Sequence, residues 1–216
     1  MGWELRYFWA SVDALSERSR LLTLLGIENE YFREEKRTDG YVELSRKGIG
    51  IKFRGNGKNL ECKILKEITN GFEKWDKYSL GSSRIDNISI ASSVKDSKLG
   101  KTNEELVERI KTLDLNRNII FCHKTRITAP ILLERTKLSI PPVFANRNFG
   151  FVELAYFSLE RLNTENLGNY FSINFEGSSD SEAVKFVAEA IVNTLQASPI
   201  YCMGYPEFLM IVSENK

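Results

Sequence analysis

Charged residues recur at every second position in several otherwise apolar segments of the chain. The charged pairs are Glu4 and Arg6, Lys52 and Arg54, Glu61 and Lys63, and Lys124 and Arg126, and a similar pair joins the amide of Asn174 with Glu176. Glu153 stands alone in such a segment, and Arg37, Asp39 and Tyr41 form a similar row. Side chains at positions i and i+2 of a strand point to the same face, so each segment predicts a strand with one apolar and one charged face. Guanidinium and ammonium groups bind phosphate oxygens, and neighbouring carboxylates bind hard divalent cations.

Whether these faces meet depends on whether the sheet closes. An open antiparallel sheet packs one face on helices and leaves the other in water, and the charge pattern alone fits that simpler arrangement. A closed barrel would instead turn the charged face inward, where burial requires opposite charges to compensate one another. Few helical residues are available to cover a wide sheet, and closure would protect its edges. We therefore expect a closed barrel.

The remaining pattern supplies the elements around these pairs. Alternation predicts strands near residues 3–9, 49–54, 60–65, 71–80, 118–128, 134–140, 149–162 and 169–176, with a long extended stretch over 31–44. Helices are predicted from 11 to 25, 102 to 113 and 181 to 195, whereas residues 81–101 resemble a long loop. The fold class is then α+β: one domain over 1–216, mainly an antiparallel closed β-barrel of about eight strands with a few flanking helices.

Composition excludes several functions. The 30 Lys and Arg residues against 29 Asp and Glu residues leave a net charge of +1, so bulk charge does not favour nucleic acid. One histidine, His123, rules out two-histidine zinc motifs, and we expect it to be a partly buried structural residue. Three widely spaced cysteines argue against zinc and a disulfide framework, and favour a reducing, cytoplasmic setting. The longest apolar run, 208–212, is too short for a membrane span.

Taken in order, the charged pairs resemble the motifs of the CYTH, or triphosphate tunnel metalloenzyme, superfamily. Gly2-Trp-Glu4-Leu-Arg6 is similar to that family's first signature, ExExK. The later pairs at 52–54, 61–63, 124–126 and 174–176, with Glu153, follow the order of its basic and acidic strand positions. The resemblance implies an antiparallel barrel whose tunnel binds a triphosphate or another phosphorylated ligand, usually with magnesium or manganese.

The resemblance also implies roles for individual residues. The ligand-binding residues would be Arg6, Arg37, Lys52, Arg54, Lys63, Lys124 and Arg126. The catalytic carboxylates would be Glu4, Glu61, Glu153 and Glu176, of which Glu4, Glu153 and Glu176 would hold the metal ion. The activity implied is a divalent-metal-dependent phosphohydrolase acting on a small anionic substrate.

Two departures from the family pattern keep a second function open. Gly2 stands where the first glutamate belongs, and Ala155 follows Glu153 where a second carboxylate is common. Fewer acidic residues imply weaker metal binding, so the alternative is a non-catalytic module that binds an anionic ligand or a protein on the same fold. The C-terminal segment 201–208 is expected to pack on the barrel or on a partner subunit, which leaves a homo-oligomer open.

Overall fold

The computed structural model describes residues 3–10, 14–27, 32–44, 47–54, 59–69, 71–81, 86–96, 104–112, 119–131, 150–161, 165–177, 181–195 and 198–214. Its strands are β1 (Trp3–Ala10), β2 (Arg33–Val42), β3 (Ile49–Arg54), β4 (Asn59–Thr69), β5 (Phe72–Ser79), β6 (Ile119–Pro130), β7 (Phe151–Arg161), β8 (Asn166–Gly177) and β9 (Tyr201–Cys202). Its helices are α1 (Ala14–Leu24), α2 (Asn87–Asp96), α3 (Glu104–Thr112), α5 (Ser181–Val192) and α6 (Tyr205–Glu214). The strand predicted at 134–140 lies outside the described residues.

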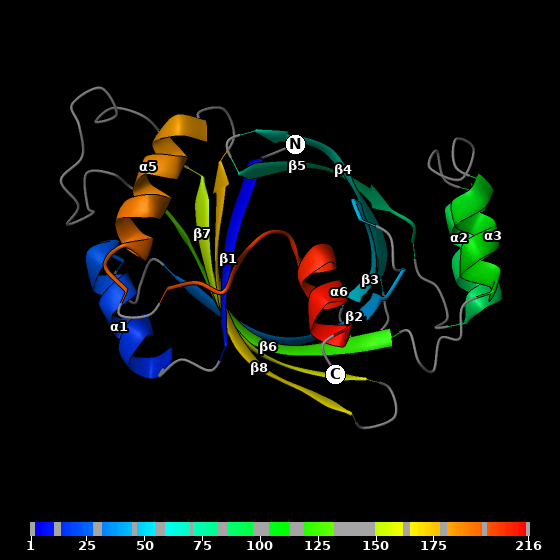
Figure 1. Ribbon diagram of the computed structural model, residues 1–216, viewed down its shortest axis with the longest axis horizontal. Coiled ribbons are helices and arrows are strands. Elements are labelled where there is room, and N and C mark those ends of the chain that lie inside the picture. The colour runs from blue at the N-terminus through cyan, green and yellow to red at the C-terminus, as the bar shows by residue number, and fades with distance from the viewer. Residues whose placement is uncertain are drawn as a thin grey trace.

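The strands form one antiparallel sheet that closes on itself (Figure 1). The order is β5-β4-β3-β2-β6-β7-β8-β1, and a further pairing of β1 with β5 joins the two ends. That seam consists of two residue pairs, Trp3 with Lys74 and Glu4 with Glu73. Farther along the same edge of β1, β9 pairs with Tyr7 and Phe8 in place of β5. The predicted closed antiparallel barrel of eight strands is therefore confirmed.

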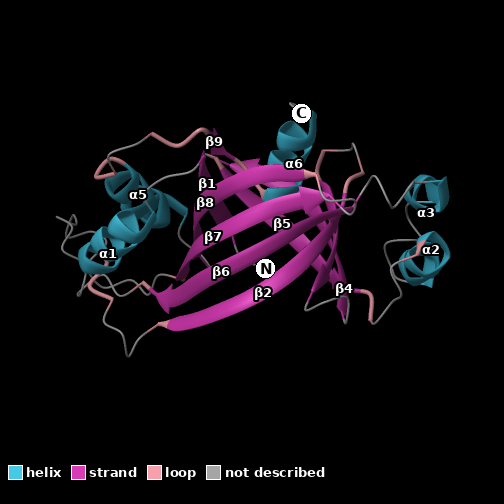
Figure 2. Ribbon diagram, turned by 90° about the horizontal axis from the view of Figure 1, so that it is seen from below, coloured by secondary structure: helices cyan, strands magenta, loops and turns pink. Residues whose placement is uncertain are grey.

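Helices cover the outer, apolar faces of the barrel on two sides (Figure 2). On one side α1 and α5 bury residues such as Leu21 and Ile191 with Trp9 and Phe171 of the barrel wall. On the opposite side α2 and α3 pack over the outer faces of β3 and β4. The apolar faces predicted from alternation thus lie outside, against helices, and the charged faces turn inward.

The predicted loop over 81–101 is wrong for residues 87–96, which form α2. Ile90, Ala91 and Val94 are buried at helical spacing. Asp86 caps the helix, since its Oδ1 accepts a hydrogen bond of 2.8 Å from the backbone N–H of Ser89. Ser92, Lys95 and Asp96 of this helix are exposed, and such polar residues conceal its short apolar stripe in the sequence.

α6 occupies one end of the barrel interior (Figure 1). It brings Tyr205, Phe208 and Leu209 into an apolar cluster with Phe8 and Phe157, whose strand positions share the inner face with Arg6 and Glu153. The rings of Phe8 and Phe208 stack with centroids 3.9 Å apart. The inner face is therefore divided along the barrel axis into an apolar half filled by α6 and a charged half that remains hollow.

At Gly50 the barrel wall lies close to Pro206 at the start of α6, and this contact leads to a prediction about stability. A Cβ at this position would lie 2.6 Å from Cγ of Pro206, so Gly50→Ala must displace the start of α6. We expect a loss of about 1–3 kcal/mol in the free energy of unfolding, measured by urea titration. Gly40→Ala is the control, since its nearest neighbour would lie 3.4 Å away. Equal losses in the two variants would show that α6 does not depend on this contact.

The helices and the cysteines of the described part of the chain bear on two expectations from the sequence, the lack of a membrane span and the lack of disulfides. None of the helices in the described part of the chain combines the length and apolar character needed to cross a membrane. Cys62 and Cys122 are buried and Cys202 is exposed, and all three are free thiols.

Candidate functional site

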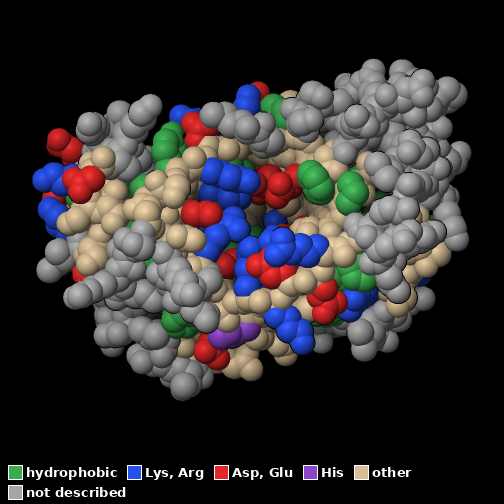
Figure 3. Space-filling view, turned by 180° about the vertical axis from the view of Figure 1, so that it is seen from behind, with side chains coloured by type: hydrophobic (Ala, Val, Ile, Leu, Met, Phe, Trp, Pro, Cys, Tyr) green, Lys and Arg blue, Asp and Glu red, His purple; other side chains and the backbone are tan. Residues whose placement is uncertain are grey.

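The charged half of the barrel is a pocket that opens on the face opposite that of Figure 1, where basic and acidic side chains surround a hollow (Figure 3). About 630 Å³ of space lies between these side chains, including part of the open mouth. Eight basic side chains line it: Arg6, Arg37, Lys52, Arg54, Lys63, Lys77, Lys124 and Arg126. Three acidic side chains join them: Glu4, Glu153 and Glu176. The pocket thus carries an excess of positive charge.

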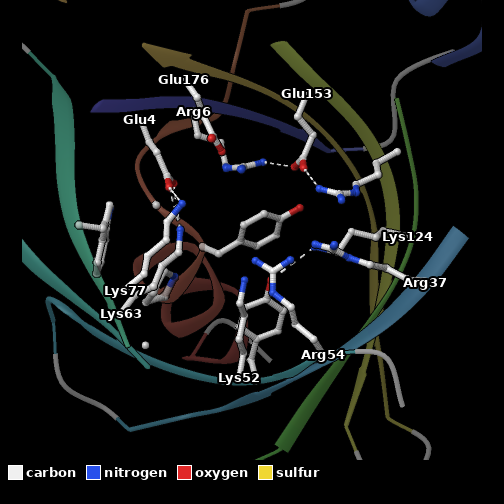
Figure 4. Close-up of a pocket in the computed structure, with 17 residues that line it drawn as sticks. Glu4, Arg6, Arg37, Lys52, Arg54, Lys63, Lys77, Lys124, Glu153 and Glu176 are labelled. Atoms are coloured by element: carbon white, nitrogen blue, oxygen red, sulfur yellow. Dashed lines mark hydrogen bonds and ion pairs between the residues drawn. The ribbon is translucent and has the colours of Figure 1, made fainter. Parts of the chain in front are cut away.

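Nearly all the residues singled out from the sequence meet in this pocket (Figure 4). The seven predicted ligand-binding residues line it, together with Glu4, Glu153 and Glu176. Glu61 does not line the pocket but lies beside it, 2.6 Å from Nε of Arg54 and 3.5 Å from Nζ of Lys52. The structure therefore gives Glu61 the position of a side chain that orients two cations, while the roles assigned to all these residues stay predictions.

Glu4 joins three strands at the closing seam. Its Oε1 accepts hydrogen bonds from Nζ of Lys63 at 2.8 Å and lies 3.1 Å from Nζ of Lys77, so β1 is held to β4 and β5. Burial alone would raise the pKa of this carboxyl, but the two ammonium groups outweigh burial and lower the pKa to about 2.

This shift predicts how stability depends on pH. A carboxyl whose folded pKa is about 2, against an ordinary 4.5, stabilises the fold above pH 4.5 and loses that contribution as the pH falls toward 2. The shift corresponds to about 3 kcal/mol. We expect the free energy of unfolding, measured in urea from pH 6 to pH 2, to fall less steeply in Glu4→Gln than in the unsubstituted protein. Parallel curves would contradict this assignment.

Glu153 is shared by two guanidinium groups. Its Oε1 lies 3.0 Å from Nη1 of Arg6, and its Oε2 accepts a hydrogen bond of 2.7 Å from Nη1 of Arg126. Burial opposes ionisation, yet Arg6 and the nearby Lys124 hold the pKa of Glu153 far below its ordinary value. Both carboxylate oxygens are therefore engaged by protein cations.

Asp39 plays the same part on the opposite wall. Its carboxylate is fully buried and lies 3.0 Å from Nζ of Lys124 and 3.1 Å from Nη2 of Arg37. Burial opposes its ionisation, but Lys124 and Arg37 lower the pKa of Asp39. These ion pairs hold the side chains of Lys124 and Arg37 in place at the pocket wall.

Lys52 is the least compensated cation of the pocket. It is buried, and its nearest carboxylate, Glu61, is 3.5 Å away. Burial and the neighbouring cations Lys63, Arg54 and Lys124 lower its pKa well below the ordinary value. The pocket therefore holds more positive charge than its own carboxylates neutralise, and an anion bound there would relieve the repulsion.

Glu4, Glu153 and Glu176 are the carboxylates predicted to hold a metal ion, and each already has a partner in the protein. Among the described residues, no group of three or more His, Cys, Asp or Glu side chains lies in a metal-binding arrangement. The oxygens of Glu4 and Glu153 would have to exchange lysine and arginine partners for the ion. Glu176 accepts a hydrogen bond of 3.0 Å from Nδ2 of Asn174. As arranged, these residues do not fit a resident metal ion, and magnesium or manganese binding by them stays a prediction.

Sequence reasoning missed two groups that line the pocket. Lys77 lies two residues beyond Trp75 on the inner face of β5. The alternation of Lys77 with Tyr78 indicates that face, but the large aromatic residues of the segment draw attention to its apolar side. Gly204, Tyr205 and Pro206 form the floor. No motif marks this floor, because its place depends on α6 entering the barrel. His123 is more exposed than the partly buried structural residue expected: its side chain is 43% exposed, and its Nε2 lies 3.2 Å from Oε1 of Glu160.

Comparisons with known proteins show similarity to solved structures only. No family model and no curated protein matches the chain. A conserved hypothetical protein from Pyrococcus furiosus is 15% identical, with 96% of this chain and 99% of that chain covered and a TM-score of 0.45. The RNA triphosphatase domain of a mimivirus mRNA capping enzyme is 7% identical, with 88% and 87% covered and a TM-score of 0.45.

The pairing of the strands defines the fold without reference to these similar structures. Eight antiparallel strands close through the pairing of β1 with β5, and the charged i, i+2 pairs of three strands, β1, β3 and β6, line one pocket. This is the architecture that the sequence resemblance implies. In fold, the chain resembles the CYTH, or triphosphate tunnel, superfamily.

Proposed function

We propose that the protein binds a small phosphorylated polyanion, such as a triphosphate or a nucleotide, in the charged half of its barrel. The observation that carries the proposal is the convergence of eight basic side chains on one pocket, where they outnumber the six carboxylates that line the pocket or pair with these cations from beside it. The pKa of Lys52, which burial and the neighbouring cations lower well below its ordinary value, supports the proposal, because an anion bound beside Lys52 would offset that repulsion. Several guanidinium forks in one pocket suit the branched oxygens of phosphate groups.

The first experiment measures thermal unfolding with sodium tripolyphosphate, pyrophosphate, ATP and, as an anion control, sulfate. A ligand that binds only the folded state raises the unfolding temperature, and the increase grows with the logarithm of its concentration relative to Kd. We expect tripolyphosphate to stabilise the protein more than sulfate does at equal ionic strength. If none of the phosphate compounds exceeds sulfate, the proposed function is wrong.

A second candidate is hydrolysis of the bound anion. The observation in its favour is Glu176, which lines the pocket and whose described contact is an amide group, that of Asn174, so it can orient a water molecule. Release of orthophosphate from tripolyphosphate, followed with and without magnesium or manganese, separates the two functions. Release supports a phosphohydrolase, whereas stabilisation without release in every condition supports a binding protein.

A further inference from the structure

Tyr205, the first residue of α6, lies at the floor of the pocket. Its side chain lines the hollow together with Arg6 and Lys124, although it comes from the far C-terminal part of the chain. The ring packs against Tyr41, with centroids 5.6 Å apart, and edge-on against Phe8 at 5.3 Å. Packing on both sides fixes the ring, so the position of its hydroxyl is set by the barrel.

The hydroxyl of Tyr205 is buried without a hydrogen-bond partner among the described residues. The residue as a whole is only 9% exposed. A buried hydroxyl that makes no hydrogen bond costs free energy, and native proteins seldom leave one unless a water molecule or a ligand completes it. This side chain therefore needs an acceptor from outside the described residues.

Two cations flank the same ring. Cζ of Arg6 lies 4.5 Å and Nζ of Lys124 lies 4.6 Å from its centroid. Each cation has a carboxylate partner, Glu153 for Arg6 and Asp39 for Lys124. An anion that reached the floor between Arg6 and Lys124 would lie beside the phenol, and its oxygens are the acceptors that the hydroxyl lacks.

We propose that Tyr205 is a ligand-binding residue whose hydroxyl donates a hydrogen bond to the innermost phosphate of the bound anion, with Arg6 and Lys124 supplying the charge. This inference rests on the proposed function and adds a contact at the floor of the pocket. It also gives the bound anion an orientation, in which the phosphate chain enters end-on from the open mouth and its innermost phosphate stops at α6. Burial raises the pKa of Tyr205, so the phenol keeps its proton and acts as a donor.

The test compares Tyr205→Phe with the unsubstituted protein by calorimetric titration with sodium tripolyphosphate. The phenylalanine ring keeps the packing against Tyr41 and Phe8 and removes only the hydroxyl. We expect binding to weaken by about tenfold or more, the loss typical of one hydrogen bond to a charged acceptor. Tyr201→Phe is the matched control: Tyr201 packs on Phe208 of the same helix but does not line the pocket, and its affinity should be unchanged.

A second measurement separates a ligand contact from a structural one. Without ligand, Tyr205→Phe should unfold at the same urea concentration as the unsubstituted protein or a higher one, because it removes a buried hydroxyl that lacks a partner. A less stable variant, or one that binds tripolyphosphate as tightly as before, would overturn the role of Tyr205 while leaving the proposed function intact. If the unsubstituted protein itself binds no phosphate compound, the proposed function fails, and the floor contact fails with it.

Discussion

Arg54→Ala is expected to weaken tripolyphosphate binding by about 100-fold while leaving the unfolding temperature nearly unchanged. Arg54 lies at the pocket lining with its side chain 31% exposed, and its Nε lies 2.6 Å from Oε1 of Glu61. The other N–H groups of the guanidinium form a fork suited to two phosphate oxygens. Two charge-assisted hydrogen bonds contribute about 3 kcal/mol, which corresponds to the stated factor. Calorimetric titration gives the Kd values.

The fold should tolerate this change because both members of the ion pair reach solvent. Glu61, left without Arg54, is 23% exposed and keeps Lys52 at 3.5 Å. Arg18→Ala is the matched control, since it removes an arginine whose Nη2 lies 2.8 Å from Glu34 outside the pocket. Equal binding losses in the two variants would mean that the anion is held by general surface charge and not in the barrel.

Glu153→Gln has the largest expected effect on stability. The substitution removes the charge shared by Arg6 and Arg126 and leaves the buried Arg6 without this carboxylate partner, while Arg126 keeps Glu35 at 2.6 Å. Loss of one member of a buried ion pair costs about 3–5 kcal/mol. We expect that loss in urea unfolding without ligand, and its recovery in saturating tripolyphosphate, because the anion supplies the missing negative charge.

The same variant also tests what Glu153 does for the ligand. If its carboxylate only compensates the two arginines, Glu153→Gln should bind tripolyphosphate more tightly than the unsubstituted protein does. If Glu153 holds a metal ion that the ligand needs, binding in the presence of magnesium should weaken instead. Glu165→Gln is the control, since it removes an exposed carboxylate 2.9 Å from Nη1 of Arg161.

The barrel wall was predictable because a strand has a period of two residues. Leu5 between Glu4 and Arg6, or Phe53 between Lys52 and Arg54, fixes which side chains share a face. Once the sheet closes, that face is the interior. The ten pocket-lining residues among those predicted follow from this rule and from closure.

What could not be predicted depends on contacts distant in the sequence. Phe8, Cys122 and Phe157 share the inner face with the charged residues, but nothing local shows that they contact a helix. α6 enters the barrel because its apolar residues complete that half, and it brings Tyr205 to the pocket. The division of the interior into a charged and an apolar half is thus a property of the assembled barrel and not of any one strand.

The short seam between β1 and β5 has a consequence for the order of events during synthesis. Glu4 forms ion pairs with Lys63 and Lys77 across this seam. Arg6 of the same strand forms an ion pair with Glu153, which is 147 residues later in the chain. The floor residue Tyr205 comes later still. Contacts so distant in sequence form slowly, since each must first close a long loop of chain. A nascent chain therefore has no pocket until almost all of these residues have left the ribosome, and ligand binding reports a finished barrel.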